Sequence, residues 1–507
     1  MTPPFLRPKN ESRFINHKEN FMRSTASTII IAVGLLINTS VSAQTLSLKD
    51  AVGSALKNNE KLKQYEERVE EKTSEDRAAW GNFLPKVELD AGYTHLNNPL
   101  TVDLDPIRQV LIQLQAGDQT QIANIYNILQ SGQQLTAAQQ QQLTLQNMAA
   151  LNTALPPFSE TFKKEDYPNA TWTAVQPIFV GGKLIAAKRA AAADRSASEN
   201  DLEKTKNELI QETVNNYLAV VLMNQVVKTR LNVLAGMEKH RQDAERLMQE
   251  GLIPKYQLLR AEVAVADAKQ NLTDDTNKRE LALIALRHSI GVSDDAKIIV
   301  SDSLMFVPTN APLNSFLETA QLDQPILKYV ADKKTQADQK YVAERADLLP
   351  QVAAFGKYEM FPQYLSTLEP HWVVGVSLSM TIFNGMSNYN KLESASHLQD
   401  EVSCLQKETS RQIDLWVHKS YREMQDAQAR YNNLDANLNL AQENLRVDDE
   451  RFQTGLGSST DLIDAQLILE KEQIDRLNAL FDYYSSLTDL YVATGHASRI
   501  LDIWKTL

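Results

Sequence analysis

Two aspartates, Asp461 and Asp464, stand three residues apart in the stretch GLGSSTDLIDAQ, residues 455–466. On a helix this spacing places both carboxylates on one face. Acids in the first turn of a helix interact favourably with the helix dipole, and one of the hydroxyl residues before Asp461 could cap that helix. The pair therefore predicts either a helix start or a charged site.

No pattern of catalytic residues accompanies this pair. The eight histidines include no HExxH motif, the chain has no GxxxxGK motif, and the GGK at 181–183 suits a turn. Cys404 is the one cysteine, and we expect it to pack within a heptad-like helix. A net charge of −12 gives no basic footprint for nucleic acid. We therefore expect no metal, no cofactor and no nucleic-acid partner.

The stretch has a second copy upstream, GLIPKYQLLRAE at 251–262. Gly251 and Gly455 are 455 − 251 = 204 positions apart, and the pairs Phe179 with Phe383 and Gly291 with Gly495 keep this offset. A constant offset over more than a hundred residues indicates an internal duplication. The copies differ in charge, because the first has Gln257 and Arg260 where the second has its two aspartates.

Upstream, the offset between the copies changes. Phe83-Leu84-Pro85 matches Leu348-Leu349-Pro350 at 350 − 85 = 265, so the first copy contains 265 − 204 = 61 additional residues. They fall within about 96–162, which includes a glutamine-rich stretch at 130–150. That composition suits either a helical insertion or a flexible, disordered loop.

Each copy has the same predicted order of elements: a helix, two strands, a very long helix, a break and a final helix. The long helices span about 184–250 and 386–454, and either would be about 100 Å long at 1.5 Å per residue. Heptad spacing of apolar residues predicts coiled-coil packing of these helices. The repeats are 44–300 and 301–507, with first helices at 46–79 and 313–347 and strands at about 84–95, 170–180, 350–361 and 371–383.

The N-terminus predicts export. An apolar run at 29–37 is followed by Val41-Ser42-Ala43, which suits cleavage by a signal peptidase after Ala43. Residues 1–43 are thus an extension and a signal peptide, with Met22 as the expected start. A membrane anchor is the alternative, but the run is shorter than the roughly 20 residues that span a bilayer.

The predicted strands alternate apolar and polar residues. WVVGVSLSMTIF, 372–383, carries Trp372, Val374 and Val376 on one face and Ser377 and Ser379 on the other. In water this pattern covers a protein core, whereas in an outer membrane it forms a barrel with an apolar exterior. Two strands in each copy make four for each chain, so a closed barrel would require several chains.

Taken together, the chain resembles the TolC-type outer-membrane efflux proteins. The resemblance rests on the duplicated plan, the FLP and LLP helix ends, the turns QPIFVGG and MTIFNGM, and the breaks GLIPKYQLLRAEV and RFQTGLGSSTDLIDAQLIL. It covers essentially the whole chain after residue 43. No single motif is diagnostic, but their order is specific to the family.

The resemblance implies a mostly α fold with a small β part. Long coiled-coil helices would form a periplasmic α-barrel, and four strands from each of three chains would form a 12-stranded outer-membrane barrel embedded in lipid. Such a homotrimer is an exit duct for efflux or type I secretion and not an enzyme. Its partners would be a periplasmic adaptor, or membrane fusion protein, and an inner-membrane RND or ABC pump. The competing interpretation is an exported trimeric coiled-coil adhesin or scaffold with no conduit.

The resemblance also assigns roles to the two breaks. Asp461 and Asp464 match the paired aspartates that surround the periplasmic aperture in the family. Some members lock that aperture with an arginine just after the motif glycine, where this chain has Gly457. We hypothesise that Arg260, beside Gln257, supplies the closing contact to one of the aspartates. Adaptor hairpins would dock at the tips, which are Gly251, Leu252, Gly455 and Leu456.

Overall fold

The computed structural model describes residues 44–302, 305–309, 311–362, 365 and 369–504. The expected start at Met22 and the signal peptide at 1–43 lie outside the described residues. All that follows concerns the unit that begins at Gln44.

The helices form matching sets, which confirms the internal duplication. The first residues of α1 and α7, and of α2 and α8, differ by 313 − 48 = 325 − 60 = 265. Those of α5 and α9, and of α6 and α10, differ by 387 − 183 = 459 − 255 = 204. The pairs are α1 (Leu48–Asn58) with α7 (Leu313–Asp323), α2 (Glu60–Gly81) with α8 (Pro325–Ala346), α5 (Lys183–Gln249) with α9 (Ser387–Gln453), and α6 (Lys255–Ile290) with α10 (Ser459–Ala493).

The prediction of one continuous helix at 46–79 and another at 313–347 was wrong, because each is two helices. Asn59 ends α1 and caps α2, accepting the backbone N–H of Lys61 at 2.9 Å. In the second copy Pro325 opens α8 and disfavours helical geometry at the residue before it, Gln324, where α7 ends.

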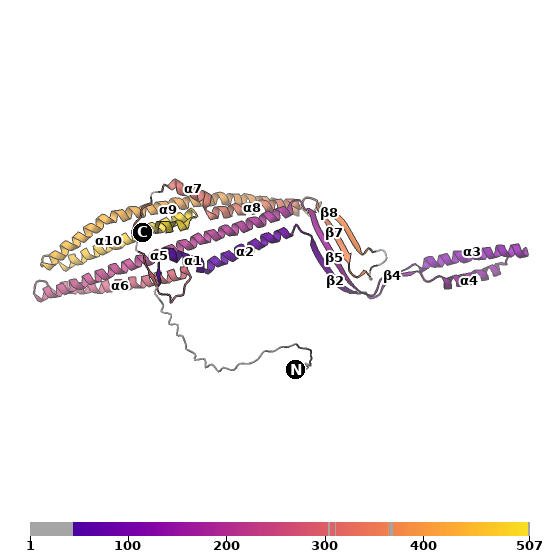
Figure 1. Cartoon of the computed structure of the whole chain (residues 1–507), viewed down its shortest axis with the longest axis horizontal. Coiled ribbons are helices and arrows are strands. Elements are labelled where there is room, and N and C mark those ends of the chain that lie inside the picture. The colour runs from indigo at the N-terminus through magenta and orange to yellow at the C-terminus, as the bar shows by residue number, and fades with distance from the viewer. Residues whose placement is uncertain (1–43, 303–304, 310, 363–364, 366–368, 505–507) are drawn as a thin grey trace, which may run out of the picture. The chain divides into compact units, whose positions relative to one another are not determined.

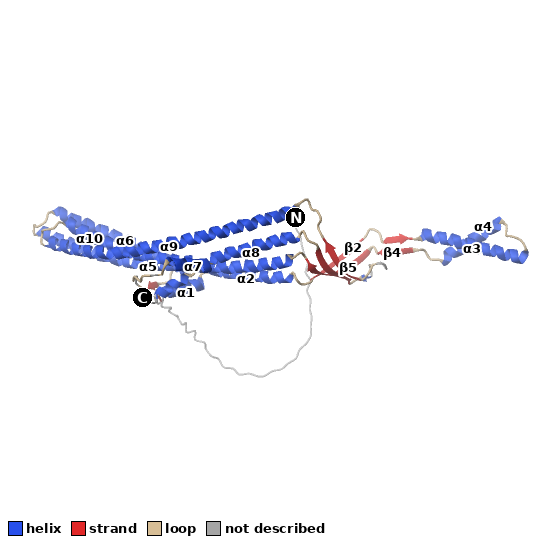
Figure 2. Cartoon of the chain, turned by 90° about the horizontal axis from the view of Figure 1, so that it is seen from above, coloured by secondary structure: helices blue, strands red, loops and turns tan. Residues whose placement is uncertain are grey.

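The long helices pack side by side. α5 contacts α6, α8, α2 and α10, while α9 contacts α10 and α8 (Figures 1 and 2). The main core lies between them and includes the fully buried rings of Tyr217, Tyr483 and Tyr484. One stretch of α5 is apolar enough to span a membrane by composition, but 44% of it is buried inside the structure. Helix packing therefore accounts for that composition.

Four antiparallel strands form one sheet in the order β2-β5-β7-β8. Their bounds are β2 (Lys86–His95), β5 (Asp166–Phe179), β7 (Gln351–Glu359) and β8 (Trp372–Ser379). The apolar side chains Val374, Val376 and Leu378 of β8 are all exposed, as are Val87 and Leu89 of β2. This apolar face has no covering layer in the described chain, which suits contact with lipid.

The 61 additional residues fold largely as a helical hairpin rather than as a disordered loop. A short ribbon of β3 (Leu100–Asp103) and β4 (Ser159–Lys163) leads to α3 (Asp105–Ser131) and α4 (Ala137–Ala154). Thr136 and Gln139 form a reciprocal capping box at the start of α4. The long helices lie at one end of the sheet and this hairpin lies beyond the other (Figures 1 and 2).

A half-buried carboxylate, Asp302, joins three separate parts of the helical region. Asp302 Oδ2 accepts hydrogen bonds from the Leu48 backbone N–H at 3.1 Å, the Tyr217 hydroxyl at 2.6 Å and the Trp504 indole at 2.8 Å. Burial opposes the charge, but these donors hold the pKa of Asp302 below its ordinary value. The surrounding elements are β1 (Gln44–Leu46), which pairs with β6 (Ile298–Val300), the 3-10 helix Ala497–Arg499 and α11 (Ile500–Trp504).

We predict that Asp302→Ala destabilises the protein by about 2 kcal/mol, because the buried Leu48 N–H and the half-buried Trp504 indole lose their acceptor and each unsatisfied group costs about 1–3 kcal/mol. The Tyr217 hydroxyl keeps Leu46 O as an acceptor at 3.0 Å. The midpoint of thermal unfolding in detergent measures the effect. Asp294→Ala is the control, since that exposed residue makes no hydrogen bond or ion pair within the described chain. Equal midpoints for the two variants would contradict the prediction.

Candidate functional site at the helix turns

The helix pairs α5–α6 and α9–α10 reverse through equivalent turns. Gly251 and Gly455 adopt φ values of 73° and 75°, in the left-handed region that favours glycine. The next residue closes each turn: Leu252 N–H donates to Leu247 O at 2.8 Å, and Leu456 N–H donates to Arg451 O at 2.9 Å. A Cβ on either glycine would meet no atom within 4 Å, so backbone conformation, not space, requires glycine.

Asp461 helps to cap α10 from the first turn of that helix, whose N-cap residue is Ser458. Its Oδ2 accepts the Ser458 N–H at 3.2 Å, and Ser458 Oγ accepts the Asp461 N–H at 3.2 Å. This reciprocal capping box satisfies backbone donors that the first helical turn leaves open. The carboxylate is exposed all the same, so the cap leaves its charge at the surface of the tip.

Asp464 lies one turn further along α10 and is also exposed. Its carboxylate has no hydrogen bond or ion pair to any other residue that the structure describes. Leu462 and Ala465 beside it are buried, which directs the opposite face of α10 outward. Leu462 belongs to a cluster that we call the tip core, formed with Ala244, Leu247, Ile253, Leu258, Ala261 and Phe452. Asp464 is therefore a carboxylate that this chain leaves available to another partner.

Arg260 and Gln257 reach from α6 to the first turn of α10. Arg260 Nη1 donates to Thr460 Oγ1, and Gln257 Oε1 accepts the Ser459 N–H at 3.2 Å. Among the described residues of this one chain, no ion pair joins Arg260 to Asp461 or Asp464. The structure thus places Arg260 next to the acidic turn, with a hydroxyl as its partner.

Gly457, where the resemblance would place a closing arginine, leaves no space for a longer side chain. Its N–H donates to Arg451 O at 2.9 Å, which draws the turn close to the end of α9. A Cβ here would lie 3.0 Å from Phe452 N and 3.1 Å from Arg451 C. Any larger side chain would require the turn to shift.

A buried histidine supports the acidic turn, and the sequence analysis missed it. His240 of α5 is 4% exposed, its Nε2 lies 2.7 Å from Ser459 Oγ, and its ring packs edge-on against Phe452. Its Nδ1 is buried with no hydrogen-bond partner in the described structure. Burial lowers the pKa of His240 to about 4, although Asp243 and Asp449 act to raise it. The available signal was its place on the apolar stripe of α5.

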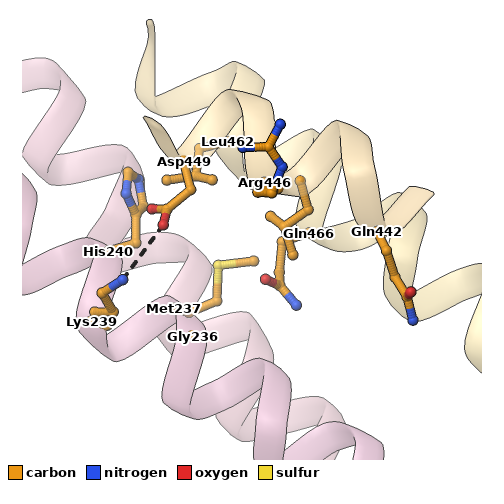
Figure 3. Close-up of a pocket in the computed structure, with 10 residues that line it drawn as sticks. Gly236, Met237, Lys239, His240, Gln442, Arg446, Asp449, Leu462 and Gln466 are labelled. Carbon is orange, nitrogen blue, oxygen red and sulfur yellow. Dashed lines mark ion pairs between the residues drawn. The ribbon is translucent and has the colours of Figure 1, made fainter. Parts of the chain in front are cut away.

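A pocket of about 290 Å³ opens beside this histidine, between α5, α9 and α10 (Figure 3). Lys239 Nζ and Asp449 Oδ2, 3.5 Å apart, form an ion pair across one side of it (Figure 3). The lining residues are Gly236, Met237, Lys239, His240, Gln442, Leu445, Arg446, Asp449, Leu462 and Gln466.

A second feature that the sequence analysis missed is a buried ionic cluster on α5, α6 and α10, further from the turns than His240. Arg230 of α5 pairs with Asp275 of α6 at 2.7 Å and with Glu470 of α10. The two acids are only 3% and 5% exposed. Asp275 also pairs with Lys278 at 2.8 Å, so removing Arg230 would leave chiefly the buried Glu470 without its cation. The duplication does not repeat the cluster, because the positions 204 residues away are Leu434, Ala479 and Ala266.

Comparison with known proteins decides the family. The family model described as outer membrane efflux protein matches residues 157–292 and 317–496, more than half of the chain. The chain belongs to the outer membrane efflux protein family. A search of curated proteins finds no significant match.

Solved structures of outer-membrane channels share the fold. The channel VceC of Vibrio cholerae matches with a TM-score of 0.69 at 17% identity, covering 89% of this chain and 96% of its own. CmeC of Campylobacter jejuni matches with a TM-score of 0.68 at 16% identity, covering 90% and 88%. The open state of MtrE from Neisseria gonorrhoeae gives 0.66 at 16% identity, covering 89% of each chain.

Family membership establishes the function at the level of the architecture. The protein is an outer-membrane exit duct of tripartite efflux systems, with its helical part in the periplasm, and it is a channel rather than an enzyme. Channels of this family are trimeric and work with an adaptor and an inner-membrane pump. The family match excludes the adhesin or scaffold interpretation.

We predict that acid destabilises the start of α10, residues 458–466, through protonation of His240. The pKa of about 4 lies below the ordinary 6.5, so the opened state binds the proton first and stability falls as pH drops from about 6.5 towards 4. At pH 5 the loss is about 2 kcal/mol, at 1.36 kcal/mol per pH unit. Hydrogen exchange of residues 458–466, corrected for intrinsic rates, measures it.

Substitution separates this effect from general acid sensitivity. His240→Phe keeps the buried ring but cannot bind a proton, so its exchange should lose the pH dependence between 6.5 and 5. His397→Phe, at an exposed position of α9, should retain it. A pH slope that persists in His240→Phe would contradict the assignment.

Proposed function

We propose that three copies of the chain close one channel through their sheet edges. β2 and β8 are the edge strands, and the outer edge of each has no strand partner in the described chain. Pairing β8 of one copy with β2 of the next would satisfy these edges and produce 3 × 4 = 12 strands. The exposed apolar face of the sheet supports this arrangement, because a closed barrel would present it to lipid.

The periplasmic aperture, in this proposal, lies at the α9–α10 turns. Each copy contributes Asp461 and Asp464, so a threefold ring would hold 3 × 2 = 6 carboxylates. The observation that carries the assignment is Asp464, exposed at the tip and unpaired within its own described chain. A ring of carboxylates around a narrow passage attracts cations and repels anions.

Arg260 supplies the closing contact, in this proposal, across the boundary between copies. Its guanidinium has five N–H donors, and the one hydrogen bond to Thr460 leaves others available. The guanidinium already reaches the first turn of α10, next in sequence to Asp461. Pairing with Asp461 or Asp464 of a neighbouring copy would hold the helix tips together, and breaking those pairs would let the tips separate.

We predict that Arg260→Ala and Asp464→Ala each raise single-channel conductance in planar bilayers and increase antibiotic entry into cells. Either change removes one side of the closing contact. Asp464→Asn should also lower the preference for cations, measured as a shift in reversal potential under a salt gradient. Lys255→Ala serves as the control, because it removes an exposed cation from the same helix.

The proposed pairing makes a specific demand on these variants. The double variant Arg260→Ala/Asp464→Ala should have about the same conductance as the single variant with the higher conductance, because the two residues share one contact. If Arg260→Ala left conductance unchanged while Asp464→Ala raised it, the pairing would be wrong and another cation would close the aperture.

Adaptor docking involves, in this proposal, the two leucines that follow the turn glycines. Leu252 and Leu456 are 61% and 78% exposed, so each turn presents an apolar side chain at its tip. Gly251 and Gly455 set the direction of these side chains by fixing the turns. The adaptor in turn recruits an inner-membrane pump of the RND or ABC class.

We predict that Leu252→Ser/Leu456→Ser weakens cross-linking to the cognate adaptor at least tenfold and lowers drug resistance in cells. Conductance and trimer formation should not change, because both side chains project away from the tip core. Leu259→Ser, at an exposed apolar position further along α6, is the control. Unchanged adaptor cross-linking would exclude the leucines from the docking surface.

A further inference from the structure

The α3–α4 hairpin is a pre-organised unit with one well-packed internal face. Arg108 is 5% exposed and donates to Asn152 O at 3.0 Å and Leu155 O at 3.2 Å, which joins the start of α3 to the end of α4. Ile112, Ala116 and Thr120 continue this buried face along α3. The helices therefore hold each other without help from other elements.

The opposite face of α3 carries an uncovered apolar stripe. Leu114 follows the buried Ile112 by two positions, which turns its side chain about 200° around the helix. The stripe residues are each 48% to 79% exposed, so together they form an apolar patch on the order of several hundred Å², larger than soluble surfaces usually tolerate. They are Ile107, Val110, Leu111, Leu114, Ile122, Ile125 and Leu129.

The stripe repeats every eleven residues. Leu111 with Ile122 and Leu114 with Ile125 keep this spacing, which corresponds to about 3.67 residues per turn. Because this value is close to the 3.6 of a straight helix, the apolar face runs along the whole length of α3. Such continuous repeats are typical of helices that pack against equivalent helices.

One charged residue identifies the occupant of the stripe. Asp118 lies on the same face, eleven residues after Ile107 and eleven before Leu129, and is exposed. A carboxylate in the middle of the patch would be costly in hydrocarbon. Gln121, seven residues after Leu114, is exposed on the same face. Polar residues within an apolar seam instead commonly specify register and the number of chains in a helical bundle, at a cost in stability.

A trimeric channel would bring equivalent hairpins together. Each hairpin joins β2 to β5 through the β3–β4 ribbon, at the end of the sheet away from the periplasmic helices (Figure 1). In a trimer, three hairpins would rise from a single barrel rim outside the cell. Their tether to the rim would give them a high effective concentration for one another.

We propose that the α3 stripes of three copies pack against one another around the threefold axis and form a helical bundle over the outer mouth of the channel. The proposal rests on the trimeric channel proposed above. The glutamine-rich α4 helices face the surrounding water. The bundle narrows the external exit, so it adds a second constriction at the opposite end from the aspartate ring.

Disulfide cross-linking of the full-length protein in outer membranes tests the bundle. Cys404, which we expected to be packed, is exposed and is first replaced in Cys404→Ser. Leu114→Cys in this background should give at least ten times more covalently linked dimer after oxidation and full denaturation than Gln113→Cys. Gln113 is exposed but lies off the stripe. Disulfides need Cα atoms within about 7 Å, so only a packed seam brings the stripe positions together.

Two further measurements keep the outcomes distinct. A membrane-impermeant maleimide should label Leu114→Cys at least tenfold more slowly than Gln113→Cys, and Ile125→Asp should abolish both differences. Equal cross-linking and equal labelling, with trimers still present on gels before heating, would overturn the bundle alone. If protein without engineered cysteines formed no trimer and conducted no ions, the proposed channel would fail instead.

Discussion

A helix of 67 residues can bury its apolar side only against partners that run beside it over most of its length. This constraint governs the helical part of the chain, because an isolated helix of that length gains little from propensity alone. α5 meets it by packing with α6, α8, α2 and α10, and α9 by packing with α10 and α8. The chain must therefore turn back at both tips, and left-handed glycines make those reversals tight enough for the paired helices to stay in contact.

Duplication supplied the architecture, and divergence between the copies supplied the contacts that join them. Arg230 and His240 of the first copy contact Glu470 and Ser459 of the second, and Gln257 also reaches Ser459. These contacts converge on α10, the helix that carries the acidic pair. The first copy thus acts as a support against which the start of α10 is held.

Pattern at the scale of whole elements was readable from the sequence, whereas individual contacts were not. A constant offset predicted both repeats, because duplicated helices keep their lengths. The split at Asn59 was missed because a cap depends on one local side-chain hydrogen bond within an otherwise helical pattern. His240 was missed because its partner Ser459 lies 219 residues away. Composition did not decide whether the 61 additional residues form helices or a disordered loop, since glutamine and alanine suit both.

The equal lengths of α5 and α9 constrain how this architecture can evolve. Deleting one residue from either helix would shift its tip by about 1.5 Å and rotate every later side chain by about 100°. The two tips would then end at different depths. Beyond the deletion, the apolar face of the shortened helix would point away from the helices that it packs against. Viable length variants should change both repeats together, in steps of seven or eleven residues that restore the packing face. Tunnels of different depth would therefore form a discrete series, suited to periplasms of different width.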